Sequence, residues 1–202
     1  MPEPRRALIV IDVQNEYFEG PLTIGHPPVQ EALADILIAM DAADAAGVPV
    51  AIVRHEAPVG SPIFAAGSER ARVHPEVEAH AGAARFVKNR ASVFTGEGMV
   101  AWLTSQGVDT VTLVGFMSNN CVLATAADAE TRGVAVEVLR EATGAIPLSN
   151  AAGSFPAEQV HGVLMALLHS NWARVASTQD WVRAVGEGRA LPGGNLIESA
   201  RR

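Results

Sequence analysis

The sequence predicts an α/β protein built on a parallel β-sheet. Short aliphatic, β-branched segments alternate along the chain with segments in which apolar residues recur every three or four positions. The turns between these segments are mostly short, and several of them contain glycine. Alternation of this kind is typical of parallel strands joined by right-handed helical crossovers.

The first part of the chain supplies two of the expected strands. Residues 7–13 form a continuous aliphatic run that ends in a charge, which is typical of a strand buried on both faces of a sheet. Residues 28–46 carry one apolar face at helical spacing, and Gly47 is expected to end that helix. A second strand is predicted at 48–54. The segment 55–75 has no clear period, and loops of this length in compact domains usually have a function.

The rest of the chain continues the alternation. Strands are predicted at 85–88, 110–115, 134–139 and 173–176, and helices at 97–106, 119–131, 156–169 and 180–185. Because domains usually contain about 100 to 200 residues, the whole chain, 1–202, is expected to form one domain. Its tail, residues 186–202, is expected to be loosely ordered or to take part in an oligomer contact.

Composition argues against several classes of function. The formal net charge is −7 at pH 7, which disfavours general binding to nucleic acid or to anionic membranes. No apolar run approaches the ~20 residues of a membrane span, and the run after Arg6 is shorter than the core of a signal peptide. A single cysteine, Cys121, cannot form an internal disulfide or a multi-cysteine zinc site. We therefore expect a cytoplasmic protein that acts on a small molecule.

Three chemically reactive residues follow predicted strands. In open parallel sheets, ligands bind outside the carboxyl ends of the strands. Asp12 ends the first strand, Lys88, the only lysine, ends the third, and Cys121 lies in the first turn of the helix after the fourth. A helix N-terminus and a nearby ammonium both lower the pKa of a thiol, so we expect a thiolate near neutral pH. Together the three residues would supply a nucleophile, a stabilising charge and a base.

Each of these residues also has a purely structural interpretation. A lone cysteine is commonly a small buried hydrophobe, a strand-end aspartate can cap the next turn, and codon bias can explain a chain that is rich in arginine. His55, after the second strand, either faces the site or is hydrogen-bonded to a loop. His161 and His169 are expected to be packing or surface residues, and His74 is expected to start a helical turn.

Three segments resemble motifs of the isochorismatase-like cysteine hydrolases, the family that includes nicotinamidases and isochorismatases. Asp12-Val13-Gln14-Asn15-Glu16-Tyr17-Phe18 resembles the D-x-Q-N-D-F motif, Lys88 to Phe94 resembles K-x-x-x-S-x-F, and Gly115 to Val122 resembles G-x-x-T-x-x-C-V. The motifs occur in the order of the family, and the resemblance covers roughly residues 6–182. Two departures are Glu16-Tyr17, where Asp-Phe is commoner, and Ser118, which replaces threonine and retains its hydroxyl.

The resemblance implies a three-layer, Rossmann-like fold, in which helices cover both faces of a six-stranded parallel sheet of order 3-2-1-4-5-6. It also implies a homodimer or larger homo-oligomer and a catalytic triad of Asp12, Lys88 and Cys121. The Phe116–Met117 peptide bond would be cis, and the N–H groups of Met117 and Cys121 would form an oxyanion hole. The implied reaction is hydrolysis of a C–N bond in a small amide or carbamoyl compound through a thioester on Cys121.

Two other functions stay open at this point. A vinyl ether hydrolase of the isochorismatase type would need Asp12 but no nucleophilic cysteine. A non-catalytic protein would bind a small molecule or sense redox conditions through the oxidisable thiol of Cys121.

The substrate pocket is expected to include Gln14, Phe18, His55, Phe94 and Phe116. Nicotinamidases of the family bind a metal through an Asp-x-His pair and a further histidine after the second strand. This chain instead has the sequence Arg54-His55-Glu56 at that point, with His74 further along. We therefore expect neither a metal nor another cofactor.

Overall fold

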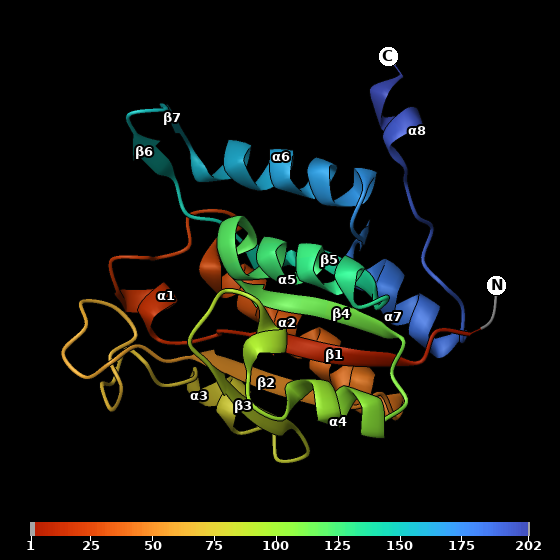
Figure 1. Ribbon diagram of the computed structural model, residues 1–202, viewed down its shortest axis with the longest axis horizontal. Helices are drawn as coiled ribbons and strands as arrows, with labels where there is room; N and C mark the ends of the chain where they lie inside the picture. Colours follow the sequence, from red (N-terminus) through yellow and green to blue (C-terminus); the bar gives the residue numbers. More distant parts are fainter. Residues whose placement is uncertain (1–2, 202) are drawn as a thin grey trace.

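The fold is a six-stranded parallel sheet between two layers of helices (Figure 1). The computed structural model describes residues 3–201. The sheet has the order β3-β2-β1-β4-β5-β8, which confirms the expected order, since β8 is its sixth strand along the chain. Its strands are β1 (Arg6–Ile11), β2 (Val50–His55), β3 (Ala84–Lys88), β4 (Thr110–Phe116), β5 (Ala135–Gly144) and β8 (Arg174–Ala176).

The two central strands, β1 and β4, are buried along their whole length. They pair in parallel from Arg6 and Thr110 at one end to Ile11 and Gly115 at the other. Because helices cover both faces, neither strand needs a polar face, and this explains why both strands are mostly apolar in the sequence.

Each face of the sheet has its own apolar core. Leu8 and Val10 pack in one core and Ala7 and Ile9 in the other, because successive side chains of a strand point to opposite faces. The first core is covered by α2 (Val29–Ala45) and α7 (Thr178–Gly186), with α3 (Pro75–Glu78) at its edge, and the second by α4 (Met99–Ser105), α5 (Leu123–Thr131) and α6 (Ala157–Ser170) (Figure 1). Among the described residues, no helix is both long and apolar enough to span a bilayer.

Two predicted elements differ from the structure near the functional edge of the sheet. The helix predicted at 119–131 begins as a π-helical turn, Ser118–Val122, and only then continues as α5. The strand predicted at 134–139 extends to Gly144. The register of its pairing with β4 shifts between Leu113 and Gly115, and beyond this irregularity the two strands stay paired as far as Phe116 and Gly144.

Five short elements were not predicted. They are α1 (Glu16–Glu19), a 3₁₀ turn (Val93–Thr95), the two strands of a hairpin, β6 (Leu148–Asn150) and β7 (Gly153–Phe155), and α8 (Leu196–Ala200) in the tail. Each is too short to show a period in the sequence. By contrast, α3 begins after His74, as expected.

Candidate active site

The carboxyl ends of four strands bring the three reactive residues together. After β1, the chain adds β2 and β3 next to one another on one side of β1, and it then adds β4, β5 and β8 on the opposite side. The direction in which strands are added therefore reverses between β1 and β4. Asp12 directly follows β1, and the turn that carries Cys121 follows β4, on the other side of this switch. Lys88 ends β3 and pairs in register with His55, which ends β2.

Asp12 is held in an unusual backbone conformation. Its φ of 50° lies in the left-handed region, which residues other than glycine seldom adopt. Its N–H donates to the carbonyl of Val53 and its own carbonyl accepts from the N–H of Gln14, both at 2.7 Å. These two bonds fix the turn after β1 and direct the fully buried carboxyl group to Lys88.

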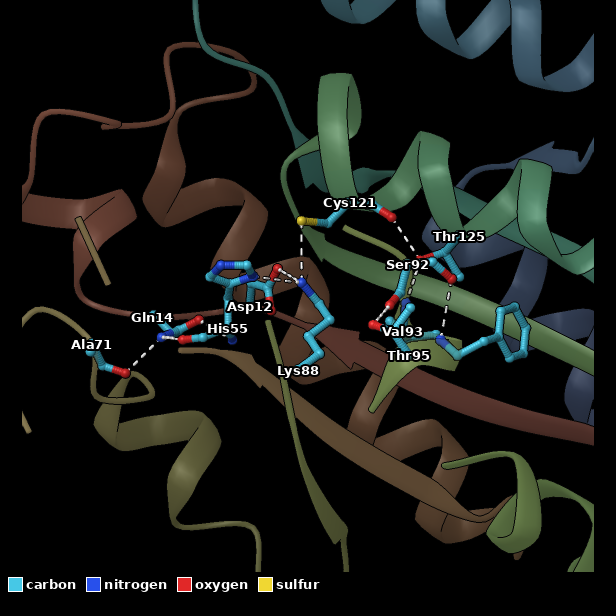
Figure 2. A network of polar contacts seen from close by, with 11 residues as sticks. Asp12, Gln14, His55, Ala71, Lys88, Ser92, Val93, Thr95, Cys121 and Thr125 are labelled. Atoms are coloured by element: carbon cyan, nitrogen blue, oxygen red, sulfur yellow. Dashed lines mark hydrogen bonds and ion pairs between the residues drawn. The ribbon is translucent and has the colours of Figure 1, made fainter. Parts of the chain in front are cut away.

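The ammonium of Lys88 is shared by three acceptors (Figure 2). Its Nζ lies 2.7 Å from Asp12 Oδ2, 3.3 Å from Cys121 Sγ and 3.3 Å from His55 Nδ1. An ammonium carries three N–H donors in a tetrahedral arrangement, so each of them can serve one acceptor. Accepting this bond at Nδ1 places the proton of a neutral His55 ring on Nε2.

One oxygen of Asp12 is left without a hydrogen bond. Oδ2 accepts from Lys88, whereas Oδ1 is buried and has no partner among residues 3–201. Burial raises the pKa of Asp12 above the usual carboxyl value, and the charge of Lys88 opposes this rise. A carboxylate with a raised pKa and a free oxygen is suited to accept a proton from a neighbour and to return it.

The thiol of Cys121 is protonated in the resting site. Burial raises its pKa to about 12, the charge of Asp12 contributes to the rise, and Lys88 opposes it. The expectation of a thiolate near neutral pH is therefore wrong for this site, because desolvation outweighs the nearby ammonium. The thiol also lies in a π-helical turn and not in the first turn of an α-helix.

Hydrogen bonds tie the Cys121 turn to the segment after β3 (Figure 2). The Thr125 hydroxyl donates to the carbonyl of Cys121 at 2.7 Å and accepts from the N–H of Val93 at 3.1 Å. Val93 starts a 3₁₀ turn, Val93–Thr95, five residues after Lys88. These contacts hold the elements that carry the ammonium and the sulfur in a fixed relation.

The backbone beside the thiol offers donors for a negative charge. The Phe116–Met117 peptide bond is cis. The N–H groups of Asn120 and Val122 donate to the carbonyl of Met117, whereas the N–H of Met117, which lies between β4 and the π-helical turn, has no acceptor among residues 3–201. Free N–H groups near a nucleophile can bind the oxyanion that forms when it attacks a carbonyl.

Comparison with known proteins identifies the family to which this fold and site belong. The family model of the isochorismatase domain matches residues 6–180. The chain belongs to the isochorismatase family. Members of the isochorismatase family are hydrolases, which places this chain among the hydrolases.

Other isochorismatase-family proteins are similar over most of the chain. A crystal structure of a protein assigned to the isochorismatases, from Burkholderia xenovorans LB400, has a TM-score of 0.95 and 49% identity, covering 98% of this chain and 95% of that one. The nicotinamidase/pyrazinamidase of Mycobacterium tuberculosis is 32% identical over 164 residues, 70% of this chain and 87% of that protein. The secreted isochorismatase effector Isc1 of Verticillium dahliae is 32% identical over 137 residues, 68% of this chain and 71% of that protein.

The residues after β2 do not fit the metal that nicotinamidases of the isochorismatase family bind. Arg54 forms an ion pair with Glu56, and His55 Nδ1 is engaged by Lys88. The ring of His74 packs against Phe18, with 4.5 Å between centroids. Within residues 3–201, no three His, Cys, Asp or Glu side chains are grouped to hold a metal ion.

Of the expected pocket residues, His55 lies nearest the triad and Gln14 holds it there. The side-chain amide of Gln14 donates to the carbonyl of His55 at 2.9 Å and accepts from its N–H at 2.8 Å. Gln14 Nε2 also donates to the carbonyl of Ala71, in the long loop, at 2.6 Å (Figure 2). Burial, followed by the charge of Lys88, lowers the pKa of the half-buried His55, which favours its neutral ring.

Aromatic side chains pack beside the carboxyl edge of β1 and β4. Phe116 is fully buried and contacts Tyr17 and Phe18, with 5.5 and 6.0 Å between ring centroids. Phe64, from the long loop, packs against both Tyr17 and His55. The sequence did not reveal the roles of Tyr17 and Phe64. Tyr17 lies in α1, which is too short to show a period, and nothing in the long loop shows which of its side chains turns inward.

Phe94 is the expected pocket residue that the structure does not bring to the triad. The Cζ atom of Arg132 lies 4.9 Å from the centroid of the Phe94 ring, and this ring packs in the core beneath α4 and α5. Arg132 follows the C-terminal end of α5, whereas Cys121 precedes its start. Phe94 therefore anchors the segment after Lys88 to α5.

Two hollows of the molecule are lined by residues outside the triad. One of about 770 Å³ borders β2, β3 and α3 and is lined by Arg54, Val73 and Phe86, among others. A second, of about 270 Å³, lies in the long loop around Phe64 and Arg70. Neither of them is lined by Asp12, Lys88 or Cys121, which are at most 3% exposed.

Proposed function

We propose that this hydrolase cleaves a C–N bond of a small amide or carbamoyl-type compound through a thioester on Cys121. The observation that carries the proposal is the contact of one ammonium, Lys88, with both Asp12 Oδ2 and Cys121 Sγ, while Asp12 Oδ1 is left free. The similarity to a protein named nicotinamidase/pyrazinamidase supports an amide as the substrate class.

In the first half of the proposed reaction, Asp12 takes the proton of the Cys121 thiol while the sulfur attacks the substrate carbonyl. The oxygen of the tetrahedral intermediate binds the N–H groups of Met117 and Cys121. Asp12 then gives its proton to the leaving nitrogen, the C–N bond breaks, and an amine or ammonia departs from the thioester.

In the second half, Asp12, again ionised, removes a proton from water. The resulting hydroxide attacks the thioester carbonyl, and the same two N–H groups hold the new oxyanion. Collapse of this intermediate expels the sulfur, which takes back the proton from Asp12 and restores the thiol. Lys88 forms no covalent bond and keeps the carboxylate and the sulfur in place throughout.

The test is a substrate screen with intact-mass detection of the acyl adduct. Purified protein is incubated with nicotinamide, N-carbamoyl amino acids, ureides, biuret and isochorismate. We expect turnover of an amide or carbamoyl compound and a transient adduct on Cys121. Cys121→Ala should abolish both. Lys88→Met should reduce turnover by at least ~100-fold, because Asp12 would then lose its counter-ion and its pKa would rise further.

Two results would overturn the proposal. If isochorismate is hydrolysed and Cys121→Ala retains that activity, the chain is a vinyl ether hydrolase. If no compound is turned over by either protein and no adduct forms, the site binds ligands without catalysis. Circular dichroism of each variant checks that it is folded.

Assembly and location stay predictions. Exposed apolar side chains on α6 and α8, such as Val163 and Ile197, support assembly as a homodimer or larger homo-oligomer. A cytoplasmic location rests on the sequence alone.

A further inference from the structure

A buried histidine lies behind the turn that carries Cys121. His161, on α6, is 5% exposed, and its Nδ1 lies 3.0 Å from Ser118 Oγ. Its Nε2 lies 3.0 Å from the carbonyl oxygen of Arg140, on β5. We propose that His161 is a positioning residue, which holds the Met117–Cys121 turn through Ser118 and so sets the two N–H groups of the oxyanion hole. Its catalytic consequence rests on the proposed function.

The proton positions follow from the partners of the ring. A carbonyl oxygen can only accept, so Nε2 of His161 must donate to Arg140. A neutral ring then has an acceptor at Nδ1, to which the Ser118 hydroxyl donates. Burial lowers the pKa of His161 below the ordinary histidine value, which favours this neutral form. Both ring nitrogens are thereby satisfied, as a buried polar group requires.

The contact reaches the turn at the point where its position matters. Ser118 is fully buried, directly follows Met117 and is the first residue of the π-helical turn. Its hydroxyl has no other hydrogen-bond partner among the described residues than His161. The bond therefore joins the turn to a helix of fourteen residues, Ala157–Ser170, and through Arg140 to the sheet.

Other contacts support the turn from the same side. The carboxamide oxygen of Asn119 accepts from the N–H of Ile146 at 3.4 Å. The ring of His26 lies edge-on to His161, with 5.6 Å between centroids, and its backbone is bonded to Ala145. Among these groups, His161 is the one whose side chain bonds to Ser118.

Two substitutions separate the two ring contacts. In His161→Asn, the carboxamide oxygen can take the place of Nδ1 and accept from Ser118, while the bond to Arg140 is lost. In His161→Gln, the longer carboxamide can reach the carbonyl of Arg140 but leaves Ser118 without its acceptor. If the contact with Ser118 is the one that matters, the His161→Asn variant should retain the reactivity of Cys121 and the His161→Gln variant should lose it. The Ser118→Ala variant should behave like His161→Gln.

The kinetic readout uses p-nitrophenyl acetate, which acylates a reactive thiol and needs no knowledge of the natural substrate. The expected result for His161→Gln and Ser118→Ala is a fall of about 10- to 100-fold in the maximal acylation rate of Cys121, since a displacement of ~1 Å can cost about 100-fold. The concentration of ester at half-maximal rate should change little. The double variant should be no worse than either single one, because both remove the same bond.

The matched control is another histidine on the same helix. His169 accepts from the N–H of Val175 through Nδ1 at 3.1 Å, two turns further from the site. His169→Gln removes a hydrogen-bonded histidine from α6 without touching Ser118. It should leave the acylation rate within about twofold of the original, even if it lowers stability.

A second readout does not depend on catalysis. The amide signals of Met117 and Cys121 in ¹⁵N-labelled protein should move in His161→Gln and Ser118→Ala, and stay in place in His161→Asn and His169→Gln. Unmoved signals in His161→Gln overturn the proposal whether or not the protein is an enzyme. Moved signals with an unchanged acylation rate also overturn it, because the position of the turn would then be irrelevant to the chemistry. If the original protein shows no acylation at all, the proposed function fails, and the amide signals alone decide whether His161 holds the turn.

Discussion

At the scale of residues, the site keeps its net charge constant by moving a proton internally. In the resting state Lys88 is paired with the Asp12 carboxylate at 2.7 Å, and the Cys121 thiol is neutral. Ionising the thiol by loss of its proton to solvent would leave a second buried anion, which desolvation opposes. Transfer of that proton to Asp12 creates a thiolate beside Lys88 without changing the total charge. The nucleophile is therefore expected to form only as it attacks.

This charge balance predicts how Cys121 reacts with iodoacetamide. Because its pKa is raised to about 12, we expect alkylation at pH 7 to be slower than that of free cysteine. The rate should rise about tenfold per pH unit from pH 7 to 9 and show no plateau, whereas free cysteine levels off above its pKa of about 8.5. Cys121 is the only cysteine, so intact mass reports on it alone, and Cys121→Ser is the blank. A plateau near neutral pH would show a preformed thiolate and contradict the resting state described above.

The sequence identified these residues but not their protonation. Asp12, Lys88 and Cys121 stand at strand ends that a parallel sheet must bring to one edge, so their proximity could be predicted. The pKa values depend on how completely loops and neighbouring side chains exclude water, which the spacing of residues does not reveal. For the same reason, the sequence could not distinguish Phe94, which faces Arg132, from Phe116, which packs beside the site.

At the scale of elements, the close approach of β1 and β4 depends on a glycine. Gly115 has a φ of +99°, and a Cβ there would lie 2.1 Å from the carbonyl oxygen of Ile11. Gly115→Ala should destabilise the fold by more than ~2 kcal/mol, because backbone strain and a clash with backbone add. Gly162, on α6, has open space around it, and Gly162→Ala should stabilise by about 0.5–1 kcal/mol. Urea unfolding of both variants checks that their free energies of unfolding change in opposite directions. Equal unfolding midpoints for the two variants would show that β1 and β4 can move apart to admit a side chain.

Elements in which apolar residues follow a clear pattern along the sequence could be predicted from it, whereas elements fixed by tertiary contacts could not. The helix from Val29 to Ala45 and the strands β1 and β4 carry long apolar patterns, and the structure places them within a few residues of the expected bounds. The π-helical turn Ser118–Val122 has no local signal. The contacts of Ser118 with His161 and of Asn119 with Ile146 come from segments more than twenty residues away.

At the scale of the whole molecule, a buried ion pair joins four elements at the edge of the sheet opposite the active site. Arg6, at the start of β1, makes two hydrogen bonds of 2.9 Å to the carboxylate of Glu137 on β5. The same carboxylate accepts from Thr112 on β4 at 2.8 Å and from Trp181 on α7 at 3.0 Å. The side chains of Arg6 and Glu137 are at most 3% exposed, so the pair is well shielded from solvent. The two ends of the sheet thus serve separate purposes, with stability at one and chemistry at the other.

This separation predicts that stability and reactivity can be changed independently. Arg6→Met should cost about 3–5 kcal/mol, because it leaves the Glu137 carboxylate buried without a counter-ion. Adding Glu137→Gln removes that charge and keeps an acceptor for Thr112 and Trp181, so the double variant should recover a large part of the loss. The acylation rate of Cys121 by p-nitrophenyl acetate should stay unchanged in every folded variant, since these residues lie at the amino ends of β1 and β5. Guanidinium unfolding measures the first effect and acylation the second. A double variant as unstable as Arg6→Met would show that packing of the arginine, and not its charge, stabilises this edge; a slower acylation would show that the two ends of the sheet are coupled.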